Sequence, residues 1–189
     1  MAGHATTDRA RTGQDLPEGM SEIQWLVALE QIRQLHARRD RCIDAHDWDE
    51  YEALHAPDHH SRHASVNVTT EDSGPVAWTS AAEMMRNVKP ILDGKQMVHH
   101  SYDPEIIFET PTKARGLWAM TDAGVWEEED GARGWHILYG YYFETYEKRG
   151  GRWVFTERRW QRYLGLNSKG SVLPDEPLKG ADAFDGDWP

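Results

Sequence analysis

The spacing of hydrophobic residues changes at Gly94, from a mainly helical periodicity before it to a strand-like alternation after it. Over residues 21–44 apolar side chains recur three or four positions apart, which predicts an amphipathic helix. Ser21 followed by Gln24 gives this helix a capping-box start. Residues 1–20 have no such period and are mostly polar, so we expect a disordered arm there.

Two more helices and one strand are expected before Gly94. Residues 45–58 predict a short helix that stops at Pro57, and residues 59–70 predict a strand. Residues 79–94 predict a third helix, with Ser80 in position to cap its start.

The second half alternates between strand-like runs and short turn-forming segments. The runs cover residues 97–110, 114–129, 134–148 and 152–166. Because such short connections join antiparallel neighbours, the pattern predicts an α+β fold: a curved, mixed or antiparallel sheet forming a cone, with three helices from the N-terminal half packed on it. We expect one domain over 21–166 and an extended C-terminal tail over 167–189.

Composition narrows the classes of function. The net charge of −11 among 189 residues argues against nucleic acid or an anionic membrane as a partner. The single cysteine, Cys42, excludes an internal disulfide and a cysteine-rich zinc site. With no long apolar run and no signal-peptide core in sight, we expect a soluble, cytoplasmic protein. Nine Trp and seven Tyr indicate aromatic surfaces in a core, a subunit contact or a pocket for a flat ligand.

Two charged residues of the first helix are candidates for a site. When the helix is drawn at about 100° per residue, Arg39 falls in the middle of the apolar stripe and Asp44 at its edge, where the helix ends. A guanidinium in that position needs an anionic or hydrogen-bonding partner. Either Arg39 pairs locally with Asp40 or Asp44, or Arg39 and Asp44 project into a cavity roofed by the helix.

The first long strand offers a histidine pair. Alternation places His99 and His100 on opposite faces, but neither face is clearly apolar, so the pattern does not decide which ring points inward. A half-buried histidine near an aspartate can act as a general base close to neutral pH. The alternative is a structural histidine that is simply hydrogen-bonded.

The last two strands offer further polar groups. His136 shares a strand face with Tyr142, and Gly140 between them permits a bulge or the close approach of another group. Arg158 and Arg159 point to opposite faces of the last strand, so one of them can face inward as an anion partner while the alternative is an ordinary solvent-facing arginine.

No metal or other cofactor is expected. Four histidines cluster around Pro57, but that proline interrupts any helix between the first two, and neither an HExxH motif nor a cysteine partner is present. The sequence also lacks a glycine-rich phosphate loop, a GxSxG motif and a dinucleotide-binding fingerprint. The clustered histidines are His55, His59, His60 and His63.

Three segments in this order resemble the SnoaL-like proteins of the nuclear-transport-factor-two-like superfamily. They are RRDRCIDAHDWDEYEALHAPD, VHHSYDPEIIFETPTKARGLWAM and YGYYFETYEKRGGRWVFTERRW, and the likeness extends over residues 21–165. The lyase branch of that superfamily includes scytalone dehydratase, bile-acid 7α-dehydratase and hexachlorocyclohexane dehydrochlorinase, which share an Asp–His pair. Its positions match Asp44 and His99 here, so the resemblance implies that His99 points inward and His100 outward.

The resemblance also implies an activity. His99, oriented by Asp44, would remove a proton next to a carbonyl group, and His136 would help water to leave, with no cofactor. The substrate would be a small apolar or cyclic organic molecule. Four residues are expected to bind it: Arg39, Arg158, Tyr142 and Trp118. Arg39 replaces the family's tyrosine, which indicates a negative charge, present or developing, beside it.

Other outcomes fit the same resemblance. The Asp–His pair could instead start an isomerisation or a polyketide-cyclase-type reaction. Some superfamily members are non-catalytic β-subunits of aromatic-ring dioxygenases, and a ligand-binding protein without turnover is a further alternative. A homodimer or homotrimer is expected, with the open, aromatic face of the sheet as the contact.

Overall fold

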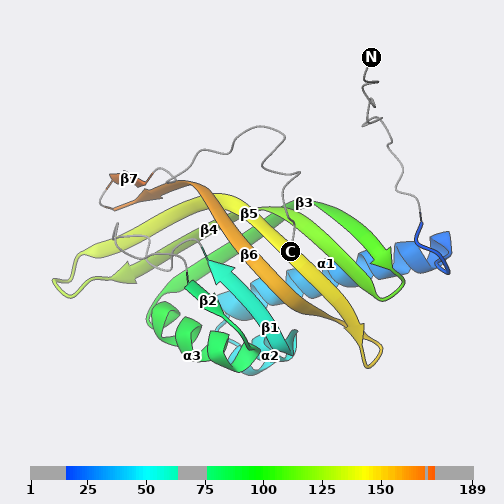
Figure 1. Ribbon diagram of the computed structural model, residues 1–189. Coiled ribbons are helices and arrows are strands. Elements are labelled where there is room, and N and C mark those ends of the chain that lie inside the picture. Colours follow the sequence, from blue (N-terminus) through cyan, green and yellow to red (C-terminus); the bar gives the residue numbers. More distant parts are fainter. Residues whose placement is uncertain (1–15, 64–75, 169, 173–189) are drawn as a thin grey trace, which may run out of the picture.

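The fold is a strongly curved sheet with three helices on one side of it (Figure 1). The computed structural model describes residues 16–63, 76–168 and 170–172. The helices are α1 (Glu22–Asp44), α2 (Trp48–Ala53) and α3 (Ala81–Leu92). The strands are β1 (His55–His63), β2 (Val76–Trp78), β3 (Gln96–Thr110), β4 (Lys113–Glu127), β5 (Arg133–Arg149), β6 (Arg152–Asn167) and β7 (Gly170–Val172).

The sheet is mixed. Its strand order is β2-β1-β6-β5-β4-β3, with β7 paired to β6. Strands β3 to β6 form an antiparallel meander, whereas β1 runs parallel to β6. The predicted α+β cone is therefore confirmed, and the four long strands lie within two residues of their expected bounds.

Side-chain caps begin each helix as the sequence indicates. At α1 the Ser21 hydroxyl accepts a hydrogen bond from the Gln24 backbone, and the Gln24 side chain accepts one from the Ser21 backbone. At α3 the Ser80 hydroxyl accepts from the Glu83 N–H at 3.1 Å. These caps fix where α1 and α3 start.

The expected stop at Pro57 is wrong. Helix α2 already ends at Ala53, and Pro57 lies inside β1. A strand interior normally excludes proline, which has no N–H to donate. Here the pairing of β1 with β6 is irregular between His55 and His60, so the missing donor falls where the ladder is interrupted. The predicted strand over 59–70 begins four residues late, and its residues 64–70 lie outside the described part of the chain.

Gly140 produces both effects that the sequence permits. The register of β5 against β6 shifts between Tyr139 and Gly140. A Cβ added at Gly140 would lie 2.3 Å from the Gln161 carbonyl oxygen, so only glycine fits without moving the backbone. The bulge contributes to the bend of the sheet.

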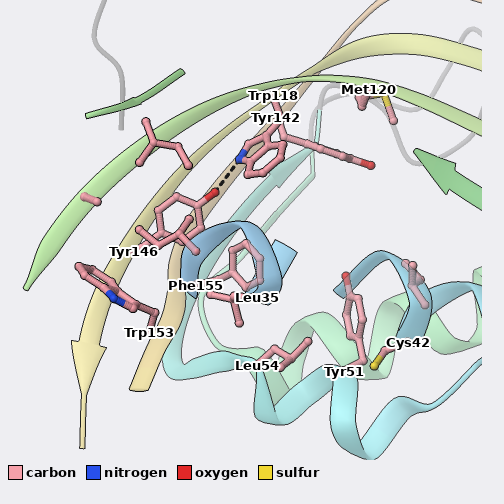
Figure 2. Close-up of a cluster of buried hydrophobic side chains, with 14 of the residues drawn as sticks. Leu35, Cys42, Tyr51, Leu54, Trp118, Met120, Tyr142, Tyr146, Trp153 and Phe155 are labelled. Carbon is pink, nitrogen blue, oxygen red and sulfur yellow. Dashed lines mark hydrogen bonds between the residues drawn. The ribbon is translucent and has the colours of Figure 1, made fainter. Parts of the chain in front are cut away.

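The core lies between the inner face of the sheet and the helices. Figure 2 shows part of it, including Leu35 and Tyr51 from the helices and Phe155 from β6. Within it the Trp118 indole N–H donates to the Tyr146 hydroxyl at 2.8 Å, the bond drawn dashed. No described helix is long and apolar enough to cross a membrane.

The two ends of the chain lie mostly beyond the described residues. Residues 1–15 of the predicted arm and 173–189 of the predicted tail are not among them. Met20, at the end of the predicted arm, is buried in the core, and β7, within the predicted tail, pairs with β6.

Candidate active site

A cavity of about 110 Å³ lies between α1, α3 and the inner face of the sheet. Its apolar lining comes mainly from α3 side chains together with Trp78, Met97 and Leu138. The α3 side chains are Met84, Val88, Ile91 and Leu92. Its polar lining, called the polar wall below, comes from α1, from Lys95 just before β3, and from β1, β3, β4, β5 and β6. A small apolar pocket with a few convergent polar groups is the usual form of a ligand site.

The predicted Asp–His pair is present at this polar wall. Asp44 is the last residue of α1, and its Oδ1 lies 2.6 Å from His99 Nδ1. The His99 backbone N–H also donates to both carboxylate oxygens, at 3.1 and 3.0 Å. Asp44 is thus fixed behind the ring, and Nδ1 carries the proton that points at it. His99 is buried and lines the cavity, whereas His100 is exposed, so the inward orientation of His99 is confirmed.

A second carboxylate, Asp122 on β4, was not anticipated. Its Oδ2 lies 3.6 Å from His99 Nε2, and its Oδ1 lies 3.1 Å from His136 Nε2. Burial alone would raise the pKa of Asp122, but the neighbouring His99 and His136 rings outweigh burial and lower it. Asp122 therefore stays ionised and connects the two histidines that line the cavity.

The absence of a side chain at Gly124 makes room for this arrangement. A Cβ there would lie 2.6 Å from Met97 Sδ and 3.0 Å from His136 Cε1. The alternation of side chains along β4 could have pointed to Asp122. Asp122 lies on the same inward face as Met120, and it is the one carboxylate between residues 114 and 124.

Two arginines flank Tyr142 at the polar wall. The Arg39 and Arg158 guanidinium carbons lie 5.1 and 4.7 Å from the centroid of its ring. Arg39 is buried and pairs with Asp40 at 2.9 Å, one of the two local acids considered, and it also lines the cavity. Its Nε has no hydrogen-bond partner among the described residues. Burial raises the pKa of the Tyr142 hydroxyl, so the phenol is neutral.

Arg158 points inward, so of the two adjacent arginines on the last strand it is the one that can pair with an anion inside the protein. Its Nε donates to Glu144 Oε1 at 2.8 Å, and its Nη2 donates to the same oxygen. Arg159 lies on the other face, over the Phe143 ring at 3.8 Å. The anion partner of Arg158 is thus a carboxylate of the protein itself, which sequence reasoning missed because the two residues come together only through the pairing of β5 with β6.

Trp118 does not line the cavity. Its ring stacks on His36 with centroids 3.9 Å apart, inside the core. The inward face of β4 is covered by α1 at this position, so Trp118 lies apart from the other residues expected to bind substrate. The other predicted residues, Arg39, His99, His136, Tyr142 and Arg158, do come together around the cavity, and Asp44 lies directly behind His99.

The histidine cluster of β1 is split by the strand. His55 and His59 are buried with ring centroids 4.7 Å apart, whereas His60 is exposed. Within the described ranges, no group of three or more His, Cys, Asp or Glu side chains is arranged to hold a metal ion.

The curved sheet and its helix-covered cavity define an α+β protein. Residues 25–159 match the SnoaL-like domain family, and because this is most of the chain, the protein belongs to that family.

Solved structures with the same fold carry lyase names. A candidate scytalone dehydratase from Novosphingobium aromaticivorans has a TM-score of 0.68 at 21% identity, covering 85% of this chain and 99% of its own. A hexachlorocyclohexane dehydrochlorinase, LinA type 2, has a TM-score of 0.63 at 14% identity over 85% of this chain and 99% of its own. LinA type 3 from Novosphingobium barchaimii has a TM-score of 0.62 at 15% identity, covering 83% of this chain and 100% of its own. At these identities the likeness establishes the fold alone.

Proposed function

We propose that this protein is a cofactor-independent lyase of the dehydratase type, acting on a small cyclic carbonyl compound. The observation that carries the proposal is the His99 ring, which lines a largely apolar cavity and has Asp44 at Nδ1 and Asp122 3.6 Å from Nε2. A histidine held in one tautomer by a carboxylate at the wall of a ligand cavity is an arrangement suited to general-base catalysis.

The reaction begins when His99 Nε2 takes a proton from the carbon next to the carbonyl group. The electron pair of that C–H bond moves into the enolate, and Asp44 stabilises the imidazolium. Arg39, whose buried Nε lacks a partner among the described residues, donates to the enolate oxygen. The enolate then collapses to a C=C bond as the C–O bond of the β-hydroxyl group breaks.

The departing hydroxide needs a proton, and the second half of the site supplies it. His136 lies 3.1 Å from Asp122, which in turn lies 3.6 Å from His99. In this proposal His136 starts the cycle as an imidazolium, protonates the leaving oxygen so that water departs, and is left as a neutral ring. Asp122 then passes the proton held by His99 to His136, which returns both rings to their starting state.

The size of the cavity favours a single-ring substrate. Its volume of about 110 Å³ is comparable to that of an apolar cavity of about 150 Å³ that holds benzene. Single-ring β-hydroxy ketones therefore form the first panel to assay, with formation of the conjugated enone followed by its ultraviolet absorbance.

Product analysis separates elimination from its alternatives. An isomerase using the same residues would return the proton to another carbon and leave the mass of the substrate unchanged, and a cyclase would form a new ring. Conversion of no compound in the panel, together with tight binding of several, would replace the lyase by a ligand-binding protein.

A further inference from the structure

A buried polar cluster centred on His36 of α1 lies beside the cavity and takes no part in the reaction proposed above. The His36 side chain is 1% exposed, and its ring lies against Trp118 at an interplanar angle of 14°. Its Nδ1 is 2.9 Å from Glu144 Oε2, and its Nε2 is 2.8 Å from Ser101 Oγ. The Ser101 hydroxyl in turn donates to Asp40 Oδ2 at 2.8 Å.

The two carboxylates of this cluster accept hydrogen bonds and have no proton to give. Burial alone would raise the pKa of Glu144, but Arg158 and His36 outweigh it and hold that pKa below its usual range. The pKa of Asp40 is likewise lowered, because His36 and Arg39 outweigh burial. Both groups are therefore ionised at neutral pH, and an ionised carboxylate is an acceptor only.

The hydrogen-bond partners of His36 determine how many protons its ring carries. Since Glu144 Oε2 can only accept, Nδ1 of the ring must carry a proton. Ser101 has a single hydroxyl proton, which goes to Asp40, so its oxygen must accept a proton from Nε2. A neutral ring would draw that hydroxyl proton to itself and leave two oxygen lone pairs facing each other across 2.8 Å. Only a doubly protonated ring satisfies all three contacts.

The charges of the cluster do not cancel. Arg39, Arg158 and a doubly protonated His36 are three cations, against the two carboxylates Asp40 and Glu144. The other titratable groups packed here, Tyr142 and Tyr146, are neutral, because burial raises the pKa of each hydroxyl. The net charge of this cluster alone is one positive unit. Both of its arginines lie at the cavity wall, which the ionised Asp122 and Lys95 also line.

From this geometry we infer that His36 is a buried imidazolium that joins the ion pairs of Arg39 and Arg158, and that its charge raises the affinity of the cavity for ligands bearing or developing negative charge on oxygen. The first half rests on the hydrogen bonds of His36 and on the two carboxylates being ionised in their pairs with Arg39 and Arg158. The second half rests on the proposed use of the cavity as a substrate site. His36 is a positioning residue in this account, because it acts through the arginines and does not touch the substrate.

Nitrogen-15 NMR of the wild-type chain tests the protonation state directly. Between pH 6 and 8 we expect both His36 ring nitrogens to give the signals of protonated nitrogens, identified by their loss in His36→Gln. One protonated and one unprotonated nitrogen at pH 7 would overturn the inference. If His36→Gln does not fold, through-bond correlations in the wild-type chain assign the same signals.

Ligand selectivity tests the consequence. Benzoate and benzamide have nearly the same shape but differ by one charge, so the ratio of their affinities at pH 7 reports the charge that the cavity senses. We expect His36→Gln to lower the benzoate-to-benzamide affinity ratio on the order of tenfold, and His100→Gln on the outer face to leave it unchanged. An unchanged ratio in His36→Gln would overturn the selectivity. Neither readout involves turnover, so failure of the lyase proposal would be recognised separately.

Discussion

At the scale of single residues, His99 is distinguished by having one carboxylate near each ring nitrogen. Asp44 contacts Nδ1 at 2.6 Å and Asp122 approaches Nε2 to 3.6 Å. Asp44 orients the ring, while Asp122 leads on to His136. The site therefore combines a base and an acid that share one carboxylate, which suits a reaction in which one proton is removed and another is delivered.

Asp122→Asn tests the connecting role. The amide keeps the size of the side chain but cannot carry a proton between the two rings. We expect kcat to fall at least tenfold with a small change in KM, since general acid–base groups contribute about a hundredfold or more. Steady-state kinetics measure this, and a change confined to KM would show that Asp122 only binds substrate.

Gly124→Ala tests the space that His136 needs. The added Cβ would meet Met97 Sδ and the His136 ring, so His136 is pushed away from Asp122. Crowding of this kind costs about 1–3 kcal/mol of stability, and we expect a larger loss of kcat than in Ala123→Ser, which adds one atom on the other face of β4. Equal activity of the two variants would remove His136 from the mechanism.

At the scale of helices and strands, the sequence predicts those elements whose ends carry a local signal. The serine caps of α1 and α3 and the turn residues between β3, β4, β5 and β6 mark the ends of these elements. The prediction of a helix that stops at Pro57 failed because a proline is tolerated inside β1 only where the pairing of β1 with β6 is irregular. That irregularity is a tertiary feature with no local sequence signal. The contact of His36 with Glu144, 108 positions apart, was invisible for the same reason.

Helix α3 supplies four apolar side chains that line the cavity, so its cap is expected to affect binding. Ser80→Ala removes the hydrogen bond to the Glu83 N–H and should cost about 1 kcal/mol of stability. Ligand affinity should fall with it, because α3 frays at the end that Ser80 holds. Ser80→Asp keeps a cap and serves as the control, with chemical denaturation and a binding titration as the measurements. An unaltered unfolding free energy in Ser80→Ala would contradict the role of the cap.

Strand β1 carries a buried pH-sensitive group. Burial lowers the pKa of His59 from 6.5 to about 3 in the folded chain, so the folded state holds this ring neutral. The neutral His59 ring does not reduce the free energy of unfolding above about pH 6.5. As the pH falls from there toward 3, the unfolded chain binds a proton that the folded chain does not, and the free energy of unfolding drops by up to about 1.4 kcal/mol per pH unit. The pKa of His55 is also lowered, mainly by burial, with the same sign.

Denaturation of His59→Leu and the wild-type chain between pH 7 and 4.5 measures this effect. We expect the variant to lose less unfolding free energy over that window than the wild type does. Parallel curves for the two proteins would mean that His59 does not drive the acid sensitivity.

At the scale of the whole molecule, the outer face of the sheet carries several exposed apolar side chains. Val98, Tyr102, Val125, Trp135, Tyr163 and Leu166 are exposed large hydrophobic side chains on β3 to β6. The register places Val98, Ala123, Ile137 and Leu166 side by side across four strands. A contiguous patch of this kind is typical of a protein–protein contact.

We therefore expect a homodimer or homotrimer that buries this face. Light scattering coupled to size exclusion should give a discrete oligomer for the wild type and a shift toward monomer for Val98→Lys with Leu166→Lys, while the cavity and its activity remain. A wild-type monomer at micromolar concentration would refute this. Poor solubility without a second kind of chain would favour the subunit alternative.

The account depends most on His99 taking a proton from carbon, and this step can be measured even before the natural substrate is known. Incubation of single-ring ketones in D₂O, followed by proton NMR, gives the rate of deuterium uptake next to the carbonyl group. We predict catalysed exchange that falls about a hundredfold or more in both His99→Gln and Asp44→Asn and is unchanged in His100→Gln. Exchange at the wild-type rate in His99→Gln would contradict the account.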